Sequence, residues 1–128
     1  MKKIINSSHA PAPVGPYNHS AAFNGILFVS GQIALNPSTG EMVQESIEAE
    51  THLVMKNIEA ILKEAGIGFS DILKCSVFVT DIQNYGSING VYAEYFNEDT
   101  APARELVDVC ALPKGANVEI SVIASIPN

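Results

Sequence analysis

The sequence predicts an α+β domain in which one β-sheet carries two helices packed on the same face. Strand-like apolar runs occur early and late in the chain, two stretches with helical spacing lie among them, and strands and helices do not alternate strictly. The chain has 128 residues, a usual size for one domain, and no repeat or linker divides it. We therefore expect residues 1–128 to form a single domain.

The first half of the chain predicts a loop, a strand and a helix, in that order. Residues 10–17 contain three prolines, which restrict the backbone and favour a stiff loop. Residues 25–35 form a continuous apolar run between turn signals, which is typical of a buried strand. Residues 47–65 carry one helical apolar stripe, with Ser46 placed to cap its start and Gly66 to close its end.

The second half predicts a strand, a helix and two further strands. Residues 72–80 are rich in β-forming residues and stop at Asp81. The second helix has its apolar face on Ile88, Val91, Tyr92, Tyr95 and Phe96. Tyr85, Tyr92, Tyr95 and Phe96 are interpreted as packing residues of this helix. The last strands are expected at residues 104–111 and 117–126, joined by a short turn.

Charge and composition restrict the partners of the protein. The formal net charge is −7, which disfavours nucleic acid because phosphate binding needs basic side chains. Only 16% of residues are charged, which favours a buried interface between subunits. Cys75 and Cys110 lie in apolar runs and are expected to be buried free thiols. The sequence shows no signal-peptide or membrane-spanning run, so we expect a cytoplasmic protein without membrane contact.

The common catalytic motifs are missing from the sequence. It contains no P-loop, no dinucleotide-binding glycine fingerprint, no Gly-x-Ser-x-Gly elbow and no HExxH. His9, His19 and His52 have no ligand spacing, so neither a cofactor nor a metal is expected.

Two charged residues next to apolar runs are candidates for chemistry. Arg104 is the only arginine and can bind a carboxylate through two parallel hydrogen bonds, although a lone arginine is more often a surface residue. Glu119 is the only charge in its strand and must point away from Val118 and Ile120. It is either a solvated surface glutamate or a functional carboxylate.

Four further residues are weaker candidates for binding a ligand. Ser30 and Gly31 lie where a turning backbone can expose amide or carbonyl groups, and Ser30 can equally be a structural hydroxyl. Tyr17 follows a rigid Gly-Pro step and could simply cover the core. Asn89 lies near Tyr92 on the second helix and could simply face solvent.

Read in order, these segments resemble the Rid family, the reactive-intermediate deaminases also called the YjgF-type family. The resemblance spans nearly the whole chain. It rests on Ala-Pro-Val-Gly-Pro-Tyr at 12–17, Phe-Val-Ser-Gly-Gln-Ile at 28–33, Asn-Pro-Ser-Thr-Gly at 36–40, Asn57 with Ile58, Val-Phe-Val-Thr-Asp at 77–81, Asn89 with Val91-Tyr92 and Tyr95-Phe96, Pro-Ala-Arg at 102–104, and Ala-Leu-Pro-Lys-Gly with Val-Glu-Ile near the end.

The resemblance implies a chorismate-mutase-like fold with a mixed sheet. It also implies a homotrimer whose sheets form a barrel-like core, with ligand pockets between subunits. Similar proteins are hydrolases that convert 2-imino acids such as 2-iminobutyrate and 2-iminopropionate to 2-oxo acids and ammonia, without a cofactor, and so detoxify intermediates released by pyridoxal-phosphate enzymes of amino-acid metabolism.

The resemblance also implies roles for the candidate residues. Arg104 would bind the substrate carboxylate and Glu119 would activate water. Tyr17, Ser30, Gly31 and Asn89 would be further substrate-binding positions.

The sequence departs from the family pattern in two places. Asn18-His19-Ser20 stands where Ser-Gln-Ala is usual, and Glu105 stands where a small residue is frequent. If residues 104 and 105 lie in a regular strand, their side chains point to opposite faces. The preference among imino acids is the property that these changes affect.

Two other functions remain open from the sequence. One is a trimer that binds small 2-oxo acids without turnover, which needs Arg104 but not Glu119. The other is the endoribonuclease or translation-inhibitor role attributed to some relatives, which the charge of −7 disfavours.

Overall fold

The computed structural model describes residues 1–127 and contains six strands and two α-helices. In chain order they are β1 (Lys3–Ile5), β2 (Ser20–Phe23), β3 (Ile26–Gln32), α1 (Ile47–Glu64), β4 (Ile72–Val79), α2 (Tyr85–Ala93), β5 (Ala103–Asp108) and β6 (Val118–Ser125).

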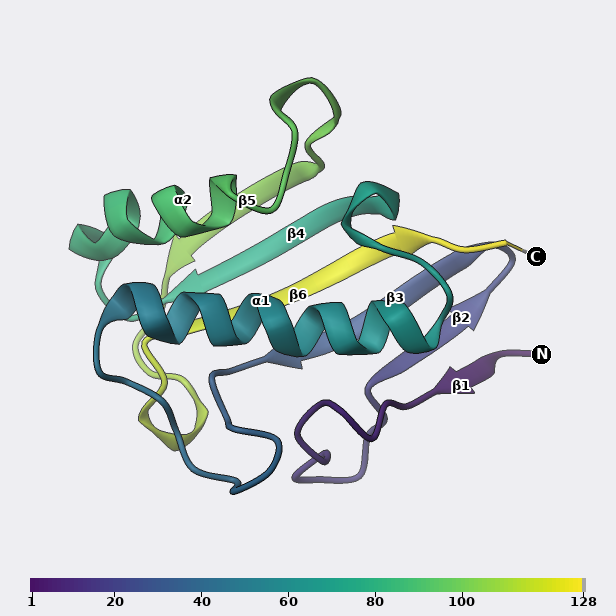
Figure 1. Cartoon of the computed structure of the whole chain (residues 1–128), viewed down its shortest axis with the longest axis horizontal. Helices are drawn as coiled ribbons and strands as arrows, with labels where there is room; N and C mark the ends of the chain where they lie inside the picture. Colours follow the sequence, from purple (N-terminus) through teal and green to yellow (C-terminus); the bar gives the residue numbers. More distant parts are fainter. Residues whose placement is uncertain (128) are drawn as a thin grey trace.

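The six strands form one mixed sheet, in the order β1-β2-β3-β6-β4-β5. The β4–β5 pair is parallel and the other pairs are antiparallel. Both helices lie on the same face of this sheet, with α1 across its middle and α2 near β4 and β5 (Figure 1). The predicted α+β architecture is therefore confirmed.

The apolar stripe and the end residues of the sequence explain why α1 forms and where it begins and ends. Val54, Ile58 and Ile61 lie on one stripe and are completely buried against the sheet. Ser46 caps the start, since its hydroxyl oxygen accepts a hydrogen bond from the amide of Ala49 at 3.0 Å. Gly66, with φ of +77°, follows the end of the helix in a conformation that favours glycine.

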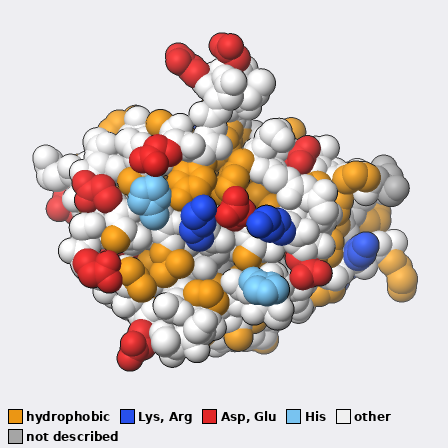
Figure 2. All heavy atoms as spheres, in the orientation of Figure 1, with side chains coloured by type: hydrophobic (Ala, Val, Ile, Leu, Met, Phe, Trp, Pro, Cys, Tyr) orange, Lys and Arg blue, Asp and Glu red, His pale blue; other side chains and the backbone are white. Residues whose placement is uncertain are grey.

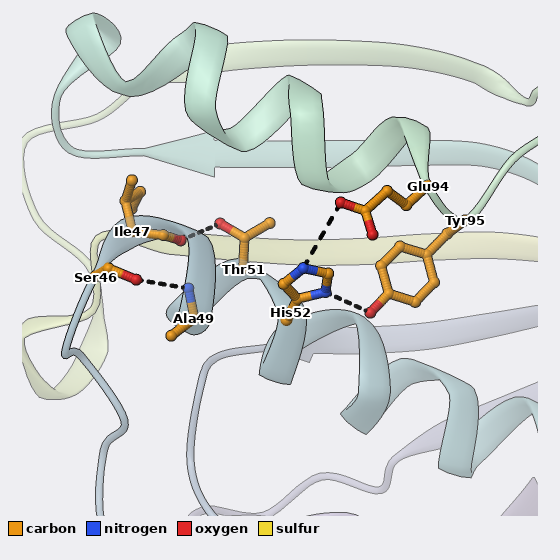
Figure 3. A network of polar contacts seen from close by, with 7 residues as sticks. All are labelled: Ser46, Ile47, Ala49, Thr51, His52, Glu94 and Tyr95. Atoms are coloured by element: carbon orange, nitrogen blue, oxygen red, sulfur yellow. Dashed lines mark hydrogen bonds and ion pairs between the residues drawn. The ribbon is translucent and has the colours of Figure 1, made fainter.

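A polar contact on the surface ties α1 to the end of α2 (Figure 3). The Nδ1 atom of His52 lies 2.8 Å from the hydroxyl of Tyr95, and its Nε2 atom lies 3.8 Å from a carboxylate oxygen of Glu94. Tyr95 also packs on Phe69, with ring centroids 5.2 Å apart. This contact fixes the helix that carries Asn89 against the rest of the domain.

The sheet face opposite the helices has no second layer in one chain (Figure 1). Phe28, Leu73 and Val107 are 52%, 48% and 41% exposed. Phe28 pairs with Ile123 across β3 and β6, so apolar side chains run across several strands. We call this surface the open face. An uncovered apolar surface of this kind is typical of an interface.

The structure differs from the sequence predictions in several details. Strands β1 and β2 were not predicted, because three or four residues are too few to show a pattern. Strands β5 and β6 follow each other in the chain but do not pair, because β4 lies between them. The expectation of two buried thiols is half wrong, since Cys75 is buried and Cys110 is exposed. No helix within residues 1–127 has the length and apolar character needed to span a membrane.

Candidate functional site

The strand register places Arg104 and Glu119 on opposite faces of the sheet. Arg104 pairs with Cys75, whose side chain is buried on the helix side. Glu119 pairs with Phe78 and points to the open face, since its neighbours Val118 and Ile120 are fully buried. The predicted orientation of Glu119 relative to these neighbours is confirmed. Within one chain, the two charged groups therefore line two separate pockets.

Residues of helix α2 hold the guanidinium of Arg104 in place. Its Nη1 atom donates to the Oδ1 atom of Asn89 at 2.7 Å, and its Nη2 atom lies 3.4 Å from the hydroxyl of Tyr85. The guanidinium carbon lies 4.7 Å from the ring centroid of Tyr92. Cation–π stacking and two hydrogen bonds fix the orientation of this cation and leave other N–H donors for a ligand.

In the described part of the chain, Arg104 has no directly bonded counter-ion, although Glu98 lines the same pocket. No ion pair among residues 1–127 involves it. Behind it, burial raises the pKa of the Cys75 thiol and of the Tyr92 phenol, so both groups stay neutral. The pocket in front of it has a volume of about 540 Å³ and includes Ala93, Phe96 and Pro102. This half-buried, oriented cation is suited to an anionic ligand.

Glu119 lies at a narrower pocket, of about 70 Å³, walled by the proline-rich loop. Burial raises the pKa of its carboxyl group, as expected of a carboxylate partly withdrawn from water. The pocket has room for water, which needs about 10–15 Å³ measured in the same way. Pro11, Tyr17 and Pro113 contribute to the wall. We call the segment 11–17 the proline wall.

Gly31 allows Glu119 to occupy this position. A Cβ atom at residue 31 would lie 2.5 Å from the Oε2 atom of Glu119 and 2.8 Å from its carboxyl carbon. A side chain there would therefore displace the carboxylate. Gly31 lies at a bulge of β3, because the pairing with β6 shifts between Val29 and Gln32.

The start of β6 is fixed by a buried carboxylate on α1. Glu50 is fully buried and accepts hydrogen bonds from the backbone amide and the side-chain amide of Asn117, both at 2.8 Å. Asn117 comes two residues before Glu119. The helix thus sets the position at which the strand with Glu119 begins.

Ser30 holds the loop beside the Glu119 pocket and is not one of the residues that line this pocket. Its hydroxyl donates to the carbonyl of Asn18 at 2.7 Å, and its amide donates to the carbonyl of His19 at 2.9 Å. It shares a separate surface depression with Tyr17, which also reaches the Glu119 pocket. The hydroxyl proton of Ser30 is thus already used within the protein.

The predicted site residues therefore fall into two groups. Tyr17, Gly31 and Glu119 meet at one pocket, with Ser30 beside Tyr17. Asn89 and Arg104 meet at the other pocket.

Glu105 is directed away from Arg104. It accepts a hydrogen bond from Ser76 and lies 3.0 Å from the ammonium of Lys74, both on the open face. The hydrogen bond from Ser76, followed by the contacts with Lys74, lowers the pKa of Glu105. The expectation that residues 104 and 105 point to opposite faces is confirmed by their pairing with Cys75 and Ser76.

Two aromatic residues that contact Arg104 were not predicted as site residues from the sequence. Tyr85 is 45% exposed and contacts Arg104, so its interpretation as a packing residue is wrong. Tyr92 is buried as expected, yet one face of its ring meets the guanidinium. The spacing of Tyr85, Asn89 and Tyr92 by four and three residues places them on one helix face, and this signal was available in the sequence.

No metal site is formed by the part of the chain that the structure describes. Residues 1–127 contain no group of three or more His, Cys, Asp and Glu side chains arranged to hold a metal ion.

The fold and the two pockets can now be compared with known proteins. The family model described as Endoribonuclease L-PSP matches residues 7–126. A RutC family protein of Synechocystis is 46% identical, with 98% of this chain and 97% of the relative covered. A mouse relative, named 2-iminobutanoate/2-iminopropanoate deaminase, is 37% identical, with coverages of 97% and 91%.

Solved structures agree over the whole chain. A Rid-family protein of Yersinia pestis, described as of unknown function, superposes with a TM-score of 0.95 at 48% identity, covering 98% of this chain and 100% of that one. The TdcF protein of Escherichia coli with bound serine superposes with a TM-score of 0.91 at 38% identity, covering 98% and 99%. The chain therefore belongs to the Rid family, the YjgF-type family to which its sequence motifs point.

Proposed function

We propose that this protein hydrolyses 2-imino acids, with 2-iminobutyrate and 2-iminopropionate as its substrates, to 2-oxo acids and ammonia. The observation that carries the proposal is the guanidinium of Arg104, which takes part in no ion pair among residues 1–127 and is held by Asn89 and Tyr92 at the edge of a pocket. The mouse and rat relatives named as deaminases of these two imines support the choice of reaction.

The fixed guanidinium supplies the binding step. A 2-imino acid carries a carboxylate next to its reactive carbon, and a planar guanidinium binds a carboxylate through two parallel hydrogen bonds. Because Asn89 and Tyr92 already fix the orientation of Arg104, little side-chain entropy is lost when the substrate binds. The serine in the E. coli relative also carries a carboxylate.

Glu119 supplies the proton transfer. Its carboxylate accepts a proton from water as the water oxygen forms a bond to C2 of the imine, and the protonated Glu119 then gives this proton to the imine nitrogen. As the C–N bond of the resulting carbinolamine breaks, the hydroxyl proton passes through Glu119 to the amino group, which leaves as ammonia, and the hydroxyl oxygen becomes the keto oxygen. Because burial raises its pKa, the Glu119 carboxylate is a better proton acceptor than a fully solvated glutamate.

Two copies of the chain are needed to bring both groups to one substrate. Arg104 and Glu119 lie on opposite faces of the sheet, so a single chain presents each of them without the other. We infer a homotrimer in which the open faces pack together and the Arg104 pocket of one copy meets the Glu119 pocket of its neighbour. Exposed Phe28 and Val107 would be buried in this assembly.

The remaining site residues take supporting roles in this proposal. Tyr17 offers a phenol at the edge of the Glu119 pocket, and Gly31 allows backbone approach at the bulge. Asn89 orients Arg104. Ser30 acts through the carbonyls of Asn18 and His19, to which it is hydrogen-bonded.

The proposal is tested by trapping the imine. A threonine dehydratase generates 2-iminobutyrate in situ, and semicarbazide traps the fraction that is not hydrolysed. The native protein should suppress trapping, Arg104→Ala should not, and Lys56→Ala, which removes an exposed cation on α1, serves as a matched control that should suppress it normally. If the native protein leaves trapping unchanged with several imino acids but binds 2-oxobutyrate through Arg104, it is a carboxylate-binding protein.

The charge distribution disfavours the endoribonuclease reading of the family description. On the helix-covered face, acidic side chains are spread over the surface and the few basic ones form no continuous patch (Figure 2). RNA binding with a steep salt dependence would contradict this interpretation.

A further inference from the structure

His19 is a buried ionisable residue that the proposed reaction does not use. It is 2% exposed, precedes β2, and lines the Glu119 pocket beneath the proline wall.

Both ring nitrogens of His19 bind the backbone of the N-terminal loop. The amide of Ser7 donates to Nδ1 at 3.0 Å, and Nε2 lies 2.6 Å from the carbonyl oxygen of Pro11. Because an amide N–H only donates and a carbonyl only accepts, Nδ1 must be bare and Nε2 must carry the proton. The ring is therefore neutral, in its Nε2–H form.

The same residue is connected through its backbone to the other wall of the pocket. Its amide donates to the Oδ1 atom of Asn6 at 2.7 Å, and its carbonyl accepts from the amide of Ser30 at 2.9 Å. Ser30 immediately precedes Gly31, over which Glu119 lies. His19 thus connects the proline wall on one side with the Gly31 bulge on the other.

We propose that His19 is a positioning residue whose neutral ring holds the proline wall over Glu119 and so supports ligand binding. This role rests on the proposed function of the pocket. A side chain that cannot accept a hydrogen bond at the place of Nδ1 leaves the buried amide of Ser7 without its acceptor.

Other ionisable groups around the pocket must be separated from this effect. Glu119 comes from β6, Tyr17 comes from the proline wall, and His9 lies in the same N-terminal loop, where its amide binds the hydroxyl of Ser7. None of the ion pairs found within residues 1–127 involves His19. These groups are unchanged in a His19 variant, so a comparison with that variant isolates the ring.

The matched pair of variants is His19→Gln and His19→Leu. Glutamine can accept from Ser7 and donate to Pro11 without titrating, whereas leucine can do neither. For 2-iminobutyrate hydrolysis, we expect His19→Leu to raise KM by about tenfold with kcat within about twofold, because only the binding wall is released. His19→Gln should restore the native KM. Equal KM values in all three proteins would overturn the proposal.

The release of the wall is also measured without turnover. The dissociation constant of 2-oxobutyrate and the ¹H–¹⁵N shifts of Ser7, Ala12 and Tyr17 are compared in the native protein and the two variants. His19→Leu should bind about tenfold more weakly and shift these amides together, because the buried amide of Ser7 loses its acceptor. His19→Gln should match the native protein, and equal affinities and shifts in all three proteins would overturn the proposal.

These readouts separate the two proposals. If the native protein hydrolyses no imine, the proposed function fails, but the amide shifts and the 2-oxobutyrate affinity still decide the role of His19. If imines are hydrolysed and the His19 variants behave like the native protein, only the positioning role fails.

Discussion

The two pockets of the chain differ in width and charge, and they serve different steps of the proposed reaction. The Arg104 pocket is wide, at about 540 Å³, and its cation is fixed by a hydrogen bond to Asn89 and by the ring of Tyr92. The Glu119 pocket is narrow, at about 70 Å³, and holds a carboxyl group whose pKa is raised by burial. In the proposed reaction, the Arg104 pocket binds the substrate carboxylate and the Glu119 pocket exchanges a proton with water.

The difference shows why neither pocket is sufficient alone. A fixed cation without a proton acceptor gives binding, and a proton acceptor without an anchor gives no orientation of the substrate. The strand register separates them to opposite faces of the sheet, so the proposed reaction requires the open faces of two copies to assemble. The predictions that follow change one pocket at a time.

The largest effect is expected from Glu119→Gln, which removes the proton acceptor and keeps the shape. We expect kcat to fall by about 10³-fold, within the usual range for loss of a general base, with KM nearly unchanged. Steady-state kinetics with 2-iminobutyrate measures both. Glu48→Gln is the matched control, as an exposed glutamate at the start of α1, on the helix side of the sheet. A kcat within about twofold of native for Glu119→Gln would exclude this role.

A smaller effect is expected from Arg104→Lys. Lysine keeps the charge but loses the paired donors and the stacking on Tyr92. We expect KM to rise by about 30-fold, more than kcat falls, because the lost contacts serve the substrate carboxylate. Lys56→Arg, at an exposed position on α1, controls for exchange of one cation for the other. An unchanged KM would show that Arg104 does not bind the carboxylate.

A still smaller effect is expected from Gly31→Ala. The new Cβ atom would lie 2.5 Å from the Oε2 atom of Glu119, so the carboxylate must move while the backbone keeps its place. We expect kcat to fall by about tenfold with a melting temperature close to native, since misplacement of a reacting group slows the chemistry. Gly68→Ala is the control, because a Cβ atom there meets nothing within 4 Å. A kcat of Gly31→Ala equal to that of the native protein would show that the close approach of residue 31 to the Glu119 carboxylate is not needed for catalysis.

The smallest predicted effect is on the stability of the fold. The ionised carboxylates of Glu119 and Glu105 change this stability in opposite directions. The raised pKa of Glu119 means that its contribution to stability is present below the unfolded pKa of about 4.3 and is lost as the pH rises through the folded pKa. The lowered pKa of Glu105 gives stability above that unfolded value, which is lost as the pH falls through its folded pKa.

Thermal unfolding of two variants tests these signs. At neutral pH, Glu119→Gln should raise the melting temperature and Glu105→Gln should lower it slightly, because Glu105 is solvent-accessible. Both differences should shrink in acid, as the carboxyl groups of the native protein become protonated. Shifts of the same sign at neutral pH would contradict the assignment.

The sequence was most informative where the pattern is local. The stripe of Val54, Ile58 and Ile61 predicted α1, and strand alternation predicted the orientation of Glu119. The separation of Arg104 and Glu119 was not predictable in this way. It depends on β4 lying between β5 and β6 and on a parallel β4–β5 register, which are contacts between distant parts of the chain.

The residues that hold the site in place could not be predicted either, because their contacts also join distant parts of the chain. No pattern in the sequence indicates that His19 and Glu50 are buried. Only the folded chain shows that His19 contacts the carbonyl of Pro11 and that Glu50 accepts a hydrogen bond from the amide of Asn117. Tyr85 was assigned to packing because its aromatic character fits a helix face. Its contact with Arg104 requires β5 to lie beside α2, which no local pattern indicates.

The central claim, a site completed by two copies of the chain, is tested most directly by complementation. Arg104→Ala and Glu119→Gln, each inactive alone, are unfolded, mixed in equal amounts and refolded together. If each site takes its arginine from one copy and its glutamate from a neighbour, random mixing should restore about one quarter of the native activity. Activity no higher than that of the separate variants would show that both groups must come from the same chain.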